Sequence, residues 1–175
     1  FTERFYKQVC AGSLAAVLDT LRYLRHETDV WFEITNLLIP GENDDPAEVE
    51  AMCAWIAENL GIDVPVHFSP FHPDYKMNDK QRTPTQTLTD ARETALRHGL
   101  RYVYTGNVHD EDGGSTLCHQ CGATLIGRDW YELTAWGLTS DGRCATCRTP
   151  CAGVFEGPPG RWGRKRQRVR LREFA

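Results

Sequence analysis

Four cysteines in two close pairs constrain the fold of this chain more than any other feature. Cys118 and Cys121 form one Cys-x2-Cys pair, and after 22 intervening residues Cys144 and Cys147 form another. A Cys-x2-Cys turn aims two thiolates at one ion, and two such turns complete a tetrahedral shell of four sulfurs. A disulfide framework is not favoured, because the chain has seven cysteines, an odd number, and its first residues carry no secretion signal. The spacing predicts a metal site of four cysteines.

The metal and the remaining cysteines follow from ordinary coordination chemistry. Four protein ligands leave no open position, so we expect a structural site. Zinc is the expected metal, and a rubredoxin-like iron centre is the main alternative because the same geometry suits iron. Cys151 lies four residues after Cys147, and we favour a small buried side chain over a competing ligand. Cys53 falls on an apolar helical stripe and is expected in the core, and Cys10 receives no role.

Upstream of the cysteine pairs, helical and strand patterns alternate. Apolar residues recur at helical spacing in 14–24, 46–60 and 84–98, and β-forming residues cluster in 30–39, 64–68 and 100–104. This alternation indicates a parallel sheet with right-handed crossovers. Ser13 and Asp45 are expected to cap helices, and Thr83 is expected to open a capping box with Pro84 at the first helical position.

Three strands are few for a sheet of this class. Parallel strands are normally covered on both faces, and segment 30–39 reads as buried on both. We therefore expect further strands to precede Phe1 or to come from a partner. The predicted organisation is an α/β unit over residues 1–108, a small zinc ribbon of β type over 109–157, and a basic tail over 158–175.

The charge of the chain is unevenly distributed. The net charge is −4, yet residues 161–172 include seven basic side chains, so the rest is distinctly acidic. This basic run favours a solvated terminus, and the alternative is a zinc-ribbon binding module that uses the tail on nucleic acid or on a protein partner. No run approaches the roughly 18 apolar residues of a membrane helix. A reducing cytoplasm fits the free thiols, so we expect a cytoplasmic protein without a membrane partner.

Polar residues gather where the expected strands end, which is where ligands bind in folds of this kind. Asn36 with the turn at 40–41, the loop 69–75 and the segment 105–107 lie at these ends. His72 with Asp74 offers acid–base chemistry, although such a pair in a proline-rich loop more often serves turn geometry. The sequence contains no nucleophile elbow, no phosphate loop and no His-Glu-x-x-His motif.

Four segments together resemble one family. They are TDVWFEITNLLIPG (28–41), FHPDYKM (71–77), YVYTGNVH (102–109) and RDWYEL (128–133) between the cysteine pairs. They are similar to the AmmeMemoRadiSam-system radical S-adenosylmethionine (SAM) enzymes, relatives of pyruvate formate-lyase activating enzymes. The resemblance covers roughly residues 1–156 and does not extend to the tail.

The resemblance implies a partial (β/α)6 TIM-like barrel, of which this chain carries the C-terminal half. It also implies a [4Fe–4S] cluster that cleaves SAM to a 5′-deoxyadenosyl radical for hydrogen abstraction. Thr35 and Asn36 resemble residues beside the ribose and methionine of SAM, and His72 resembles a position beside the adenine.

The chain departs from this family at the cluster. The family's cluster loop, Cys-x3-Cys-x2-Cys, does not occur in this sequence. We therefore expect the C-terminal part of a radical SAM enzyme, inactive by itself, whose partner is the missing N-terminal half of the barrel. The resemblance leaves open whether the substrate is a protein or a small molecule. Nucleic acid is not favoured as a partner.

Overall fold

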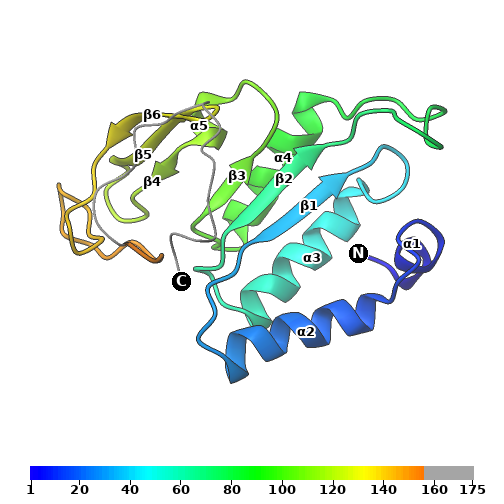
Figure 1. Cartoon of the computed structure of the whole chain (residues 1–175), viewed down its shortest axis with the longest axis horizontal. Helices are drawn as coiled ribbons and strands as arrows, with labels where there is room; N and C mark the ends of the chain where they lie inside the picture. Colours follow the sequence, from blue (N-terminus) through cyan, green and yellow to red (C-terminus); the bar gives the residue numbers. More distant parts are fainter. Residues whose placement is uncertain (156–175) are drawn as a thin grey trace, which may run out of the picture. The chain divides into compact units, whose positions relative to one another are not determined.

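The protein folds into two units of mixed α/β type. The structure is a computed structural model that describes residues 1–155, and the chain divides into Phe1–Gly114 and a second unit that begins at Ser115 (Figure 1). The mixed α/β class is confirmed. The half barrel stays a prediction, because the first unit holds one sheet of three strands. The basic tail at 158–175 lies outside the described residues.

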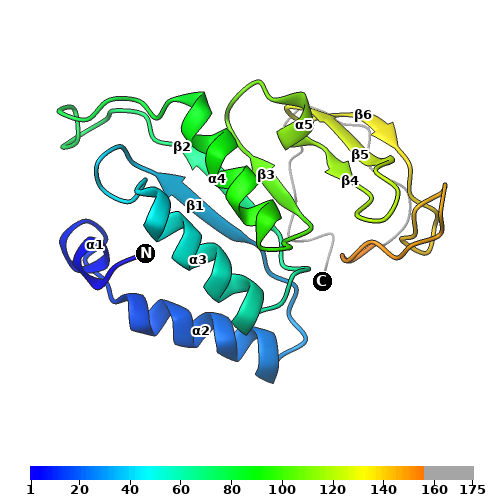
Figure 2. The same cartoon turned by 180° about the vertical axis from the view of Figure 1, so that it is seen from behind.

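The first unit is a parallel sheet with helices on one face. Its strands run in the order β1-β2-β3 and all pair in parallel. Figures 1 and 2 show the sheet from opposite sides, with α3 and α4 lying together behind and then in front of the strands. The elements are α1 (Glu3–Gln8), α2 (Leu14–Glu27), β1 (Ile34–Leu38), α3 (Pro46–Asn59), β2 (Val66–Pro70), α4 (Thr85–Arg97), β3 (Val103–Thr105) and α5 (Glu111–Gly114).

The core lies between the sheet and α3 and α4. Phe68 and Val66 from β2 and Leu38 from β1 are fully buried there. Helical spacing in α3 and α4 supplies the opposing side chains, because residues three or four apart share one helix face. The buried helical residues are Val49, Met52, Cys53, Ile56, Leu88, Ala91 and Ala95.

The expectation that segment 30–39 is buried on both faces is wrong. The strand is only β1, and Val30 and Trp31 before it are 58% and 41% exposed. Within β1 burial alternates, and Leu37 is 44% exposed. One face of β1 packs on the helices, whereas none of the helices in residues 1–155 covers the other. The apolar residues of segment 30–39 are therefore not buried on both faces of the sheet.

Two of the three expected helix caps form. The Ser13 hydroxyl accepts a hydrogen bond from the N–H of Ala16 at 3.4 Å, and Asp45 Oδ1 accepts from the N–H of Ala47 at 2.7 Å. Both contacts are local, so the residue order determines them.

The expected capping box at Thr83 is wrong. Pro84 is the N-cap of α4 and no side chain caps this helix. Thr83 is buried, and its hydroxyl donates to the Leu38 carbonyl at 2.6 Å while accepting from the Phe71 N–H at 2.8 Å. The hydroxyl thus joins the last residue of β1 to the loop that follows β2. Lys80 and Glu42 join the loop after β2 to the loop after β1 by an ion pair at 2.5 Å.

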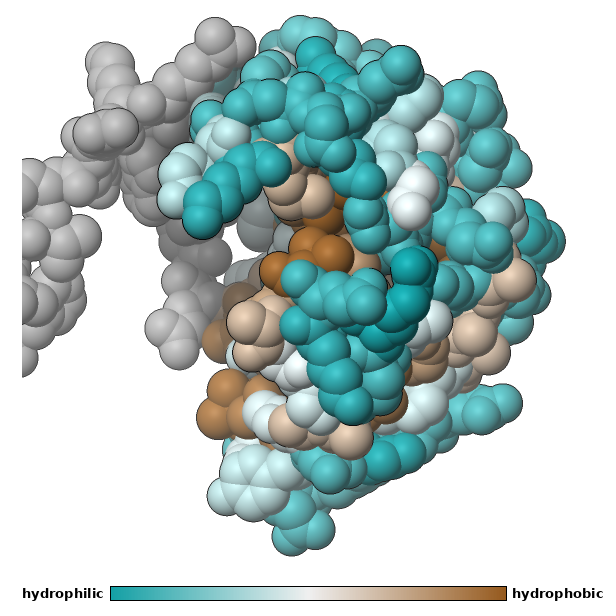
Figure 3. Space-filling view, turned by 90° about the vertical axis from the view of Figure 1, so that its right-hand side faces the viewer, coloured by the Kyte–Doolittle hydropathy of each residue, from teal (hydrophilic) through white to brown (hydrophobic). Residues whose placement is uncertain are grey.

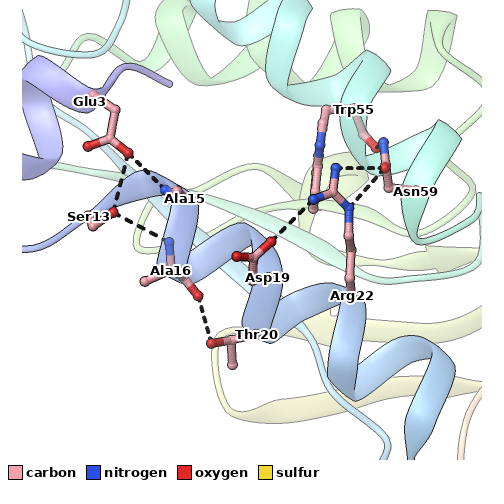
Figure 4. Close-up of polar contacts among 9 residues, drawn as sticks. All are labelled: Glu3, Ser13, Ala15, Ala16, Asp19, Thr20, Arg22, Trp55 and Asn59. Atoms are coloured by element: carbon pink, nitrogen blue, oxygen red, sulfur yellow. Dashed lines mark hydrogen bonds and ion pairs between the residues drawn. The ribbon is translucent and has the colours of Figure 1, made fainter.

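Arg22 and His26 of helix α2 both contact Asn59 at the end of α3. Arg22 Nε and Nη2 donate to Asn59 Oδ1, both at 3.2 Å, and the guanidinium lies 5.2 Å from the centre of the Trp55 ring (Figure 4). Asp19 accepts from Arg22 on the other side. An arginine that stacks on an aromatic ring loses packing as well as charge when it is replaced.

The second unit is a small antiparallel sheet in the order β4-β5-β6. Its strands are β4 (Thr116–Leu117), β5 (Thr124–Asp129) and β6 (Glu132–Trp136). Leu125 and Leu138 are its buried leucines. Gly137 sits where a Cβ atom would lie 2.2 Å from the Thr124 carbonyl oxygen, so only glycine fits at the end of β6. None of the described helices is long and apolar enough to span a membrane.

We predict that Thr83→Val destabilises the first unit. The substitution keeps the side-chain shape but removes the hydroxyl that bonds to Leu38 and Phe71, so the free energy of unfolding should fall by about 1–3 kcal/mol. Urea unfolding followed by far-UV circular dichroism measures this change. Thr20→Val is the matched control, since its exposed hydroxyl bonds only to the Ala16 carbonyl one turn earlier (Figure 4). An equal effect of both substitutions would contradict the bridging role.

Candidate metal centre

The structure brings the four predicted metal ligands together. The Sγ atoms of Cys118, Cys121, Cys144 and Cys147 all lie within 4.8 Å of one another. Two of the separations are 3.6 Å, between Cys118 and Cys147, and 3.7 Å, between Cys121 and Cys144. A tetrahedral ion with metal–sulfur bonds of about 2.3 Å places its sulfurs about 3.8 Å apart. The sulfur positions therefore fit one tetrahedral ion.

Each cysteine pair lies on a turn with the same hydrogen bonds. In the first turn, the N–H of Cys118 donates to the Ala123 carbonyl at 2.8 Å and the N–H of Gly122 donates to the Cys118 carbonyl at 2.9 Å. In the second turn, the N–H of Cys144 donates to the Thr149 carbonyl and the N–H of Arg148 donates to the Cys144 carbonyl, both at 2.9 Å. The two turns are thus equivalent halves of one site.

The residue after each second cysteine has a left-handed backbone. Gly122 has a φ of 72° and Arg148 a φ of 65°. Glycine adopts this conformation freely, whereas a residue with a side chain pays a conformational cost. The surrounding structure holds Arg148 in place, because its carbonyl accepts from Arg143 Nη1 at 3.3 Å and its guanidinium lies 3.7 Å from Asp141.

The sheet of the second unit positions both turns. The first turn connects β4 to β5, and the second follows the loop after β6. Leu138 pairs with Cys144 in an isolated antiparallel bridge, and Arg143 pairs with Pro150 in another. Cys118 and Cys144 are buried, Cys147 is half-buried and Cys121 is exposed. The ion would therefore be largely enclosed with one exposed ligand, as in a structural site.

The second turn favours thiolates. The hydroxyl and the backbone N–H of Thr149 lower the pKa of the Cys147 thiol to about 6. Cys147 Sγ and Thr149 Oγ1 lie 3.2 Å apart. The backbone N–H groups of Cys147 and Thr146 lower the pKa of the Cys144 thiol, against the effect of burial. Two ligands are thus prepared for deprotonation by groups of their own turn.

In the first turn, the neighbouring thiols make Cys121 harder to ionise. The Ala123 N–H lowers the pKa of Cys121, but the hydrogen bond with Cys147, burial and the other thiols outweigh it and raise this pKa to about 12. Thiolates at such short range repel one another, so all four ionise together only when a cation lies among them. Metal binding should therefore release protons, and acid should release the metal.

The other cysteines lie apart from this group. Cys53 is fully buried on α3, as predicted, and burial raises the pKa of its thiol to about 12. Cys151 is buried in the second unit, where its N–H donates to the Gly142 carbonyl. Cys10 is exposed. The expectation that Cys53 belongs to the core is confirmed, and Cys151 is buried as favoured from the sequence.

The three residues expected near SAM occupy different environments. Thr35 points to the face of the sheet that α3 and α4 leave uncovered. Asn36 points to the helices, where its Nδ2 lies 3.4 Å from Met52 Sδ and its Oδ1 is buried without a hydrogen-bond partner in the described residues. His72 is exposed, and its Nδ1 lies 2.9 Å from the carbonyl of Pro73. No hydrogen bond joins any two of the three in residues 1–155.

Sequence reasoning missed two groups of polar residues. Thr149 supports Cys147, and its position two residues after the second cysteine pair was a local signal for this role. Glu33 Oε2 lies 2.6 Å from His67 Nε2, and the His67 ring stacks on Tyr104. These three residues are far apart in the sequence, and only strand register reveals that they meet.

We predict that Gly122→Ala weakens metal binding. No atom lies within 4 Å of the added methyl group, so the only cost is the left-handed backbone. That cost of about 1–2 kcal/mol corresponds to a zinc affinity about five- to thirtyfold lower. Competition with a chromophoric chelator measures the affinity. Gly12→Ala is the control, because an added Cβ there meets only ordinary contacts. Unchanged affinity in Gly122→Ala would contradict the assigned turn geometry.

Comparisons with known proteins give one relative and no family. No protein-family model matches the chain. The chain is 41% identical over 144 residues to MJ0808, an uncharacterized protein of Methanocaldococcus jannaschii. The match covers 82% of this chain and 43% of that protein. The chain thus spans less than half the length of this relative.

Proposed function

We propose that the second unit binds one structural zinc ion through Cys118, Cys121, Cys144 and Cys147. The observation that carries this proposal is the convergence of four Sγ atoms within 4.8 Å. Zinc suits a closed shell of four thiolates and has no redox chemistry of its own. With Leu125 and Leu138 as its buried leucines, so small a unit gains from the metal the stability that its core does not supply.

We predict that the purified chain holds about one zinc ion and no acid-labile sulfide. Cys118→Ser and Cys144→Ser should remove most of the metal, because each deletes a thiolate and leaves three. Cys10→Ser should keep the metal, because Cys10 is exposed and belongs to the other unit. Elemental analysis of each variant gives the content.

The pH dependence of this site has a definite sign. Protons compete with the metal for thiolates, so zinc should leave as the pH is lowered and should be retained above the range in which Cys147 ionises, whose pKa is about 6. If the purified chain held one iron ion and no sulfide, the site would be a rubredoxin-like iron centre and not a zinc site. Retention of metal in both ligand variants would contradict the site itself.

We also propose that the chain is the C-terminal part of a radical SAM enzyme. The resemblance of segments 28–41, 71–77 and 102–109 supports this proposal. Two further observations agree with it. Within residues 1–155, the parallel sheet has helices on one face only, and the match to MJ0808 covers less than half of that longer protein. A parallel sheet of three strands suits a part of a barrel, because further strands would pair at its edges and enclose the face that α3 and α4 do not cover.

The residues of this chain do not fit a [4Fe–4S] cluster. Four of its seven cysteines form the tetrathiolate group, Cys53 is enclosed in the core, and Cys10 and Cys151 belong to different units. No three thiols remain that are close enough to hold three irons. In the proposed enzyme the cluster would therefore be bound by residues outside this chain, and this chain would provide one wall of the site, with Thr35 exposed on the open face of the sheet.

The full-length polypeptide that carries this sequence tests the proposal. Its sequence should contain a Cys-x3-Cys-x2-Cys loop. Purified without oxygen, it should hold about four irons with matching sulfide in addition to the metal of the four-cysteine site, and when reduced it should convert SAM to 5′-deoxyadenosine. The chain of 175 residues alone should hold no such cluster and should not cleave SAM. Chromatography of the nucleoside product and a sulfide assay supply both readouts. A full-length protein whose sequence lacks the Cys-x3-Cys-x2-Cys loop would contradict the proposal.

A further inference from the structure

The face of the parallel sheet that no helix of residues 1–155 covers carries mainly polar side chains. Register places Thr35 beside His67 and His67 beside Tyr104, with Leu37 beside Ser69 in the next row. We call this the open face, because α3 and α4 pack on the opposite one (Figures 1 and 2). The inner residues of a parallel sheet are usually apolar on both faces. Polar residues on a face of this kind therefore indicate contact with something other than a covering helix.

Glu33 and Tyr104 hold the ring of His67 from two directions. Glu33 Oε2 lies 2.6 Å from His67 Nε2, and the His67 and Tyr104 rings stack with centres 4.9 Å apart at 27°. A carboxylate beside Nε2 favours a proton on that nitrogen, and in the neutral tautomer that carries this proton Nδ1 is a hydrogen-bond acceptor. Nδ1 makes no hydrogen bond in residues 1–155.

Stability does not explain this arrangement. The side chains of His67 and Glu33 are 30% and 46% exposed, and exposed ion pairs contribute little to folding. The geometry instead matches a base with an orienting group, in which the second ring nitrogen is left for a ligand. The side view in Figure 3 shows hydrophobic residues exposed among hydrophilic ones on the side where β1 and β2 end.

The charges on the open face limit the ligand. Thr35 and Ser69 supply hydroxyl groups on neighbouring strands, and the Glu33 carboxylate lies beside His67. Neither Lys nor Arg occurs among the β1, β2 and β3 residues. Among the residues of these three strands an anion would find no permanent cation, whereas a neutral donor finds an acceptor nitrogen and hydroxyls on neighbouring strands. Gly106 follows β3, and a side chain in its place would crowd Ser69 Oγ at 3.0 Å.

We propose that the open face binds a small neutral molecule that carries hydroxyl groups, with His67 Nδ1 accepting a hydrogen bond from one of them. Glu33 is a positioning residue that fixes the ring and its tautomer. This inference deepens the proposed function, on which it rests for the role of the molecule as a substrate. The binding itself requires neither a cluster nor SAM.

Nitrogen-15 NMR of the histidines in the full chain tests the proposal. His67 should be found with its proton on Nε2, and adding 1,2-propanediol should shift its Nδ1 resonance. Glu33→Gln should raise the share of the Nδ1–H form and weaken the affinity for the diol about two- to tenfold. Glu50→Gln is the matched control, because Glu50 makes an equivalent pair with His98 at 2.7 Å between α3 and the end of α4. It should leave the His67 response unchanged.

Three results would overturn the inference. They are no shift of His67 with the diol, a shift with inorganic phosphate alone, and an equal loss of affinity in Glu33→Gln and Glu50→Gln. The first two exclude a site for neutral hydroxyls, and the third removes the role of Glu33. Diol binding by a chain whose full-length form makes no 5′-deoxyadenosine would keep this site and reject only the radical chemistry.

Discussion

A parallel sheet needs a covering layer on each face, and the first unit supplies only one from the described residues. The helices α3 and α4 bury Val66 and Phe68 completely, while Leu37 stays 44% exposed on the other side. The edge of β1 and the open face support the same interpretation. The edge leaves backbone groups that a further strand could pair with, and the open face leaves side chains that a larger fold would enclose. The organisation of the first unit, its proposed site and its proposed place within a longer enzyme all depend on this one-sided cover.

The second unit depends on a different constraint, which is repulsion among thiolates. Four sulfur atoms within 4.8 Å cannot all carry charge without a cation between them. Thr149 and the backbone N–H groups of the second turn offset part of the cost. A dication removes the rest, so the metal completes the unit in the way a larger hydrophobic core completes other domains. Because the four cysteines leave no open coordination position, the metal is suited to a structural role.

Local features of the structure were predictable from the sequence, and non-local ones were not. The spacing of Cys118 and Cys121 and the cap at Asp45 depend on residues a few positions apart, so the residue order specifies them. Thr83 looked like a cap but bonds to Leu38, 45 positions away. The apolar run around Leu37 suggested burial on two faces, because hydrophobicity does not reveal how many layers cover a sheet.

The site on the open face shows the same limit. Glu33 and His67 are 34 positions apart, and Tyr104 is further still. They meet because β1, β2 and β3 are aligned in one particular register, which no property of the separate segments contains. The resemblance to radical SAM enzymes pointed to the adjacent Thr35 and Asn36, and their strand positions send these two side chains to opposite faces.

The equivalence of the two cysteine turns has a consequence for how the second unit forms. Each turn closes through hydrogen bonds between residues at most five positions apart, so either can capture an ion before the rest of the sheet exists. Bringing the second turn to a half-coordinated ion then closes a loop of 22 residues, and the entropy of such closure grows only slowly with length. Changes in the length of the β5–β6 hairpin should thus alter the rate of metal capture less than changes within either turn.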